Sequence, residues 1–285
     1  MRVRRSWRGP LLVAAALLAA LLTIGLWLLV RSAHSVNKPI SLGSVYWILY
    51  REDLIRMQAA DPAVFQPILS GPSTFMLEHS ATGNAPAGAE PAELFFSYAD
   101  FQAALQNHSI IPGVKYVAYD PENWPATPTQ EQQNPRHYLQ LFGQAAQSNG
   151  YKAILIPARD LMQVPGAVCG QRKGETLSAA YVRCGLPMTA AYGSVYVIQA
   201  ASLELDLPSL KQLVQSSAAA ARAANPAVTI FATLSTIPPG GGPTSATALN
   251  KAARTILPYV QGLELNSTAS TDSRMIAFLH DLAGQ

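Results

Sequence analysis

The chain has 285 residues, of which 49% are hydrophobic and 13% charged, and its formal net charge is +3. Five of the twenty Lys and Arg residues lie in residues 1–31, which contain no Asp or Glu, so fifteen basic and seventeen acidic residues remain and the rest of the chain carries −2. A domain of that charge has no positive field to attract phosphate backbones, which excludes a nucleic-acid partner from our expectations.

The chain begins with a basic stub and an apolar run. Residues 1–9 hold four arginines, and no charged residue occurs from Leu11 to Val30. As a helix that run would span about 30 Å, the thickness of a bilayer core, with the arginines on the cytoplasmic side. A signal peptide has the same polarity, and Ala33–Ser35 would suit cleavage. We expect residues 1–35 to be either a membrane anchor (spanning through 11–30, with the C-terminal domain outside) or a signal peptide that releases a secreted protein, and 36–43 to be a spacer.

Residues 44–285 alternate short β-rich runs with amphipathic runs of helical period. Seven strands are clear from their apolar, β-branched and aromatic residues, and an eighth is weak. The clear ones are Ser44–Tyr50, Thr74–Glu78, Lys115–Tyr119, Ala153–Ile156, Val195–Gln199, Val228–Leu234 and Gly262–Leu265, and the weak one is Leu94–Phe96.

Helices are expected between these strands. They run from a Ser97 cap toward Asn107, over His137–Ser148, Ser209–Ala224 and Ala246–Leu257, and from Asp272 to about Leu282. Strands alternating with helices imply a parallel sheet, and uniformly apolar strands imply that both of its faces are covered. The sequence therefore predicts an α/β fold, a (β/α)8 TIM-like barrel that tolerates irregular units. An open doubly wound sheet is the alternative, but the chain has no GxGxxG or Walker A loop of the kind such sheets usually carry.

The two cysteines, Cys169 and Cys184, flank a polar segment. In an oxidising compartment they would form one disulfide, and two free thiols are the alternative. No CxxC pair is present and the histidines are scattered, so we expect no zinc site and no cofactor.

The strongest chemical signal directly follows the strand at Lys115–Tyr119. Asp120 and Glu122 are two residues apart, so on an extended backbone both side chains point to one side. Carboxylates this close repel, which raises a pKa and leaves a proton donor at neutral pH. Trp124 adds a flat apolar surface of the kind on which sugars stack. The alternative is that Asp120 caps a loop and Glu122 is solvated.

Other polar residues stand where predicted strands end. In a (β/α)8 barrel those ends meet at one mouth, where active sites lie. We therefore expect a ligand to be held there by Tyr119, Trp124, Asp160, Gln199, Glu204 and Asn266.

The Asp120-x-Glu122 pair resembles the end of the DxxDxDxE motif of family 18 chitinases. The resemblance implies that Glu122 is a general acid and that Asp120 helps the acetamido group of the substrate to act as nucleophile. The two earlier Asp positions of that motif are Lys115 and Ala118 here. More broadly, YDPENWPATP, IPARDL and VIQAASLE resemble actinobacterial secreted barrel proteins, which implies an envelope or exported location.

Three functions remain open. The first is an extracytoplasmic carbohydrate-active enzyme, glycoside hydrolase-like, that acts on a polysaccharide or cell-envelope glycan. Glu122 would donate the proton, Asp120 would assist, and Glu204 or Glu264 would supply any second carboxylate. The second is a catalytically inactive barrel that binds glycan or another envelope ligand. The third is a calcium or magnesium site made by Asp120, Glu122 and Asn266.

Overall fold

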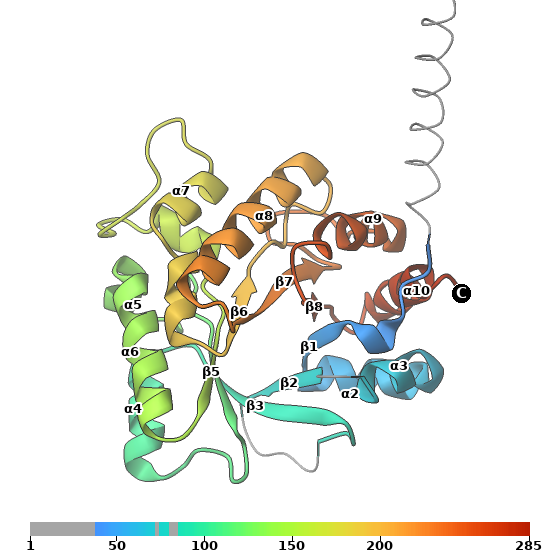
Figure 1. Ribbon diagram of the computed structural model, residues 1–285, viewed down its shortest axis with the longest axis horizontal. Helices are drawn as coiled ribbons and strands as arrows, with labels where there is room; N and C mark the ends of the chain where they lie inside the picture. Colours follow the sequence, from blue (N-terminus) through green and yellow to red (C-terminus); the bar gives the residue numbers. More distant parts are fainter. Residues whose placement is uncertain (1–37, 72–73, 80–84) are drawn as a thin grey trace, which may run out of the picture. The chain divides into compact units, whose positions relative to one another are not determined.

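The computed structural model describes residues 38–71, 74–79 and 85–285 (Figure 1). The expected anchor or signal segment, residues 1–35, lies outside the described residues. Across the three described ranges, no helix is both long enough and apolar enough to cross a bilayer.

Eight parallel strands form a closed barrel in which each strand pairs with the next along the chain and β1 pairs with β8. This confirms the predicted (β/α)8 barrel and rules out the open sheet. The strands are β1 (Tyr46–Tyr50), β2 (Thr74–Glu78), β3 (Ala89–Phe95), β4 (Tyr116–Tyr119), β5 (Lys152–Leu155), β6 (Val195–Ile198), β7 (Thr229–Ser235) and β8 (Gly262–Asn266).

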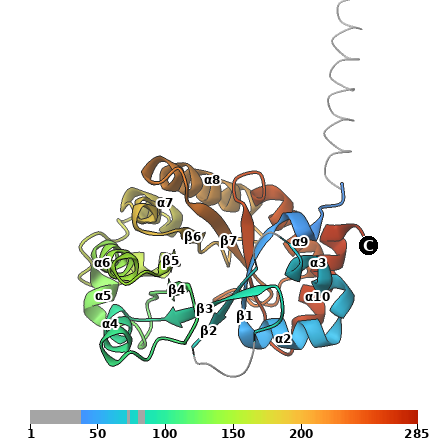
Figure 2. The same cartoon turned by 60° about the horizontal axis from the view of Figure 1, so that its bottom comes forward.

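Helices surround the strands on the outside, as Figure 2 shows. The α-helices are α2 (Arg51–Ala60), α3 (Pro62–Leu69), α4 (Tyr98–Asn107), α5 (Thr129–Gln133), α6 (Pro135–Ser148), α7 (Leu177–Arg183), α8 (Leu207–Ala224), α9 (Ala246–Ile256) and α10 (Asp272–Ala283). Three short 3-10 helices, η1 (Leu42–Ser44), η2 (Arg159–Gln163) and η3 (Pro187–Tyr192), complete the elements of the described ranges. The unit between β5 and β6 is irregular, because η2, α7 and η3 replace a single long helix.

The sequence explains why the helices begin where they do. The Ser97 side chain accepts a hydrogen bond from the Asp100 amide at the start of α4, as its position before the helix predicts. In α8, Asp206 caps the Ser209 amide, and the buried stripe begins with Leu210 and Leu213. Each fully buried leucine of that kind contributes about 1.5–3 kcal/mol of hydrophobic stabilisation, which fixes the helix on the barrel.

The barrel interior is a packed core, because alternate residues of each strand point inward. The inward cluster is Ile48, Phe75, Leu77, Ala92, Leu94, Ala118, Ile154, Ile156, Val195, Val197 and Phe231. Toward the strand starts, the interior is filled by aromatic rings, with the Phe75 centroid 4.9 Å from that of Tyr116 and 5.9 Å from that of Phe231. The mouth of the barrel is at the opposite end, where the strands finish and inward side chains reach the surface.

Candidate functional site

Strand alternation determines which residues reach the mouth. Each residue two positions beyond an inward core residue also points inward, one layer nearer the strand ends. This periodicity assigns the mouth layer to Tyr50, Phe96, Asp120 and Gln199. Ser235 lies four positions beyond the inward Phe231, and Asn266 lies two beyond Glu264, which is in register with the inward Ile48, so both also point inward. Glu122 follows Asp120 by two and extends beyond the end of β4.

The side-chain amide of Gln199 connects the two predicted acids. Its Nε2 donates to Asp120 Oδ1 at 2.9 Å and to Glu122 Oε1 at 3.2 Å. The two acceptor oxygens therefore lie no further apart than the sum of those distances, about 6 Å. The Tyr50 hydroxyl donates to the other oxygen of Asp120 at 3.3 Å. Residues from β1, β4 and β6 thus converge at one point, although they are far apart in sequence.

Burial changes the acidity of both carboxyl groups. Asp120 is 2% exposed, and burial, followed by the nearby Glu122 and Glu264 carboxyls, raises its pKa well above the usual range. Burial also raises the pKa of Glu122, with a further contribution from Asp160, although the hydrogen bond from Gln199 opposes the shift. The pair therefore retains protons at a pH where ordinary carboxyl groups are ionised.

A third carboxyl group lies one layer below the pair. Glu264, in β8, is 1% exposed and accepts a hydrogen bond from the Thr233 hydroxyl of β7. Burial raises its pKa to about 7; the bond from Thr233 lowers it, and the Glu122 carboxyl raises it further. Glu264 therefore faces the barrel interior, beside the inward Ile48 of β1 with which it is in register.

A cleft of about 350 Å³ opens beside Glu122. Its walls come from the segments after β4, β5, β6 and β7, and they include Glu122, Arg159, Asp160, Gln199, Ser202 and Gly240. The Asn123 amide donates to Asp160 Oδ1 at 3.1 Å, which ties the segment after β4 to that after β5. Burial raises the pKa of Asp160 as well. Glu122 and Asp160 are the two acids among the residues that line the cleft.

Arg159 holds the segment that carries Gln199. Its Nε donates to the Gln199 carbonyl at 2.7 Å, and its Nη2 donates to the Ala201 carbonyl at 2.6 Å and to Ser202 Oγ at 2.9 Å. Ser202 has φ of 78°, in the left-handed region that side chains other than glycine rarely adopt. The guanidinium therefore positions Gln199 and holds a strained backbone at the rim of the cleft.

Aromatic side chains stand at the ends of β2, β3 and β4. The ring of Phe96 lies 4.6 Å from Trp124 in an edge-on arrangement and 4.5 Å from His79, between ring centroids. Trp124 remains 37% exposed, so part of the indole is open to solvent. Sequence reasoning missed Phe96, which counting alternate strand residues would have found.

Tyr119 and Glu204 lie away from the cleft. Tyr119 points outward to the helices: its hydroxyl donates to Glu131 Oε2 at 2.5 Å and its ring stacks on Phe142. Glu204 is 2% exposed and accepts a hydrogen bond from the Ser235 amide at 2.9 Å, so it supports the end of β7. Neither residue is brought to the acid pair.

Asn266 ends β8 on the inward side. Its Oδ1 is buried and receives no hydrogen bond from any residue that the structure describes. A buried acceptor without a donor is costly, so this oxygen is suited to receive a hydrogen bond from a ligand at the mouth.

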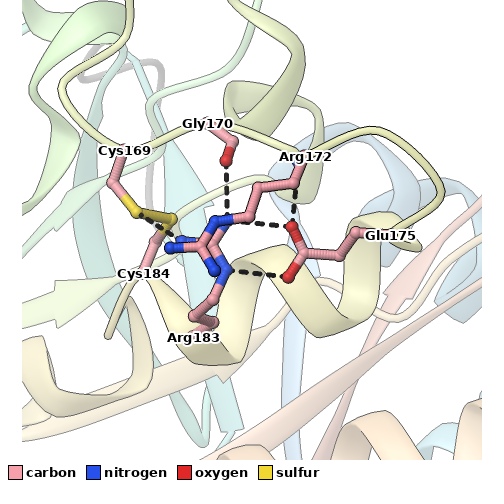
Figure 3. The surroundings of a disulfide bond; sticks show 6 residues. All are labelled: Cys169, Gly170, Arg172, Glu175, Arg183 and Cys184. Atoms are coloured by element: carbon pink, nitrogen blue, oxygen red, sulfur yellow. Dashed lines mark hydrogen bonds and ion pairs between the residues drawn. A yellow bond between two sulfur atoms is a disulfide. The ribbon is translucent and has the colours of Figure 1, made fainter.

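The predicted disulfide between Cys169 and Cys184 is present, which excludes the free-thiol alternative. Beside it, Arg183 donates to both oxygens of Glu175 at 2.8 Å and to the Gly170 carbonyl at 2.7 Å (Figure 3). The guanidinium of Arg183 lowers the pKa of Glu175 to about 2. The disulfide and this ion pair both cross-link the irregular unit between β5 and β6. The first element of that unit, η2, forms a wall of the cleft.

No cluster suited to a metal ion is found in the described ranges, where no three or more His, Cys, Asp and Glu side chains come together as ligands. The calcium or magnesium site expected from Asp120, Glu122 and Asn266 has only two side chains of these kinds and stays a prediction.

No protein-family model matches the sequence, and no curated protein matches it. The resemblances to family 18 chitinases and to actinobacterial secreted barrels thus receive no support from these comparisons. The chemistry of the site has to be argued from its geometry.

Proposed function

We propose that the protein is a glycoside hydrolase-like enzyme in which Glu122 is the proton donor and Asp120 assists it. The observation that carries the proposal is the pair itself: two carboxyl groups bound by one amide of Gln199, beside a cleft, with the pKa of each raised. A glycosidic oxygen needs a carboxylic acid that is still protonated near neutral pH, and burial supplies that condition.

The spacing of the acids favours one kind of mechanism. The carboxyl groups of an inverting pair stand about 6.5–9.5 Å apart, with a water between them. The oxygens of Asp120 and Glu122 that accept hydrogen bonds from Gln199 are at most about 6 Å apart, which is too close for that mechanism. Asp160 is the other acid that lines the cleft, whereas neither Glu204 nor Glu264, the expected second carboxylates, does so. A substrate-assisted reaction needs no enzyme nucleophile, and it is the mechanism that the Asp-x-Glu resemblance implies. In it, Asp120 would orient the acetamido group of the sugar while Glu122 protonates the leaving oxygen.

Trp124 and Asn266 support a sugar as the ligand. The partly exposed indole offers an apolar face for a sugar ring, and the unpaired Oδ1 of Asn266 offers an acceptor for a hydroxyl or amide group. An extracytoplasmic location, on the membrane or after secretion, is part of the proposal. The disulfide supports it because such bonds persist in oxidising compartments.

The test is hydrolysis of neutral and anionic oligosaccharides by the unaltered protein and by Glu122→Gln. Loss of a general acid should lower kcat by about 10²–10⁴-fold, whereas KM should change little. Glu90→Gln is the matched control, because Glu90 lies in β3 toward the opposite end of the barrel and pairs with Lys115. Full activity in Glu122→Gln on a cleaved glycan would refute the assignment.

A glycan-binding barrel without turnover is the second candidate. It is favoured because neither Glu204 nor Glu264, the carboxylates expected to act with Glu122, lines the cleft. Binding of oligosaccharides that survives Asp120→Asn combined with Glu122→Gln, with no hydrolysis by the unaltered protein, would select this function over the first.

A further inference from the structure

A second, larger cavity adjoins the cleft. It encloses about 630 Å³ between α7 and α8, and both cavities fall in the usual size range of small-molecule sites, about 300–1,000 Å³. Three residues line both of them: Arg159, Leu177 and Ser202. The two cavities therefore share a wall at the rim, so that a chain-like ligand could pass from Glu122 toward α8.

The shared wall is held rigidly. Arg159 binds Ser202 Oγ at 2.9 Å and the carbonyl oxygens on either side of the turn, and it reaches Ser178 Oγ of α7 at 3.3 Å. The strained φ of Ser202 falls at this junction. Strain that is maintained by surrounding contacts is typical of ligand-binding segments.

The lining of the larger cavity suits a hydroxyl-rich ligand. Its polar side chains come from α7, from the segment after β6 and from α8, and they include Ser178, Ser202, Ser209, Gln212 and Ser216. Hydroxyl and amide groups both donate and accept hydrogen bonds, as sugar hydroxyls require.

Charge argues for a neutral ligand. The cations that line the two cavities are Arg159 and Arg183, and the acids are Glu122, Asp160 and Asp206. Arg183 is already paired with Glu175. No excess positive charge is left to bind the carboxylates of a uronic-acid polymer or the phosphates of a phosphodiester polymer.

We propose that the cavity between α7 and α8 continues the cleft and binds the part of a neutral oligosaccharide that lies beyond the bond next to Glu122. This rests on the proposed function, and it adds that the substrate is a neutral chain of several sugar units. Binding should then strengthen with chain length, because a disaccharide at Glu122 would leave the second cavity empty.

The experiment measures binding by calorimetry in a Glu122→Gln background, which prevents turnover. The probes are disaccharides and hexasaccharides of N-acetylglucosamine, mannose and glucose, with galacturonate hexasaccharide as the anionic probe. Gln212→Trp fills the cavity from an exposed position of α8. Gln215→Trp is the matched control, because it places the same side chain at another exposed position of that helix, outside the cavity lining.

Gln212→Trp should weaken binding of the neutral hexasaccharide about ten-fold while the disaccharide changes far less, and Gln215→Trp should alter neither. Equal effects on both lengths, or unchanged hexasaccharide binding in Gln212→Trp, would overturn the inference and leave the proposed function standing. Tighter binding of galacturonate would overturn the neutral class. Failure of every oligosaccharide to bind the parent would refute the proposed function itself, and this inference with it.

Discussion

Glu264 gives a test of the buried acids that does not depend on any substrate. The perturbation is Glu264→Gln, which keeps the shape of the side chain and an oxygen that can accept the Thr233 hydroxyl, but removes the ionisable proton. Because the folded protein holds the pKa of Glu264 at about 7 and the unfolded chain holds it near 4.5, the folded state binds this proton more tightly. Stability should therefore fall as pH rises between those two values, and level off above the upper one.

The magnitude follows from the two pKa values. Ionising Glu264 in the folded barrel costs about 3 kcal/mol over the full window, of which about 2–3 kcal/mol falls between about pH 5 and pH 8. The variant should lose this component of the pH dependence. It should match the parent near pH 5 more closely than near pH 8, where it should be the more stable of the two.

Urea denaturation of parent and variant at both pH values measures the difference directly. Comparing the two proteins at each pH cancels the contributions of the other titrating groups to the extent that they are unchanged. The slope with respect to urea should agree between the proteins, which checks that each unfolds to the same extent. If the free energies of unfolding of parent and variant differed by the same amount at both pH values, the raised pKa of Glu264 in the folded state would be refuted.

Three further predictions concern other parts of the barrel. Replacing Cys169 and Cys184 with alanine should lower stability by about 3 kcal/mol, the chain-entropy value for a loop of 15 residues, and Tm by about 6–12 °C; an unchanged melting curve would contradict this. Gly143→Ala should lower stability by about 1–3 kcal/mol despite the better helix propensity of alanine, because its Cβ would lie 2.2 Å from the Tyr192 carbonyl oxygen; a Tm at or above that of the parent would contradict the close packing of α6 on η3. Trp124→Ala should weaken glycan binding by about 0.5–1.5 kcal/mol or more with Tm nearly unchanged, since the indole is partly exposed; calorimetry and melting curves together check both parts.

The sequence predicts the barrel well because its strands are short apolar runs between amphipathic helices. Thr74–Glu78 matches β2 at both ends, and most other strand bounds differ by one or two residues. β3 is the exception: it begins at Ala89 and contains Pro91 and two glutamates, which argue against a central strand. The Ile111 amide donates to the buried Glu93 carboxylate, a tertiary contact that no local pattern shows.

The candidate site is harder to read from the sequence than the fold. The short spacing of Asp120 and Glu122 was visible, but the amide of Gln199 that joins them comes from a strand end 79 residues beyond Asp120. Tyr119 lies away from the acid pair for a local reason: it is adjacent to Asp120 and therefore points to the other face of the strand, toward α6. The role of Glu204 could not be inferred because its partner is the backbone amide of Ser235 at the end of β7, which only the closed barrel brings near.

The disulfide also decides how the protein should be prepared. Arg159, Asp160 and Leu177, which line the cleft, precede or lie within the loop that Cys169 and Cys184 close. Material made in a reducing cytosol would carry the same sequence with that wall less firmly held. If such material failed to bind glycan, the missing disulfide could be the cause, and the result would say little about the barrel itself. Free thiols should therefore be titrated before any activity screen.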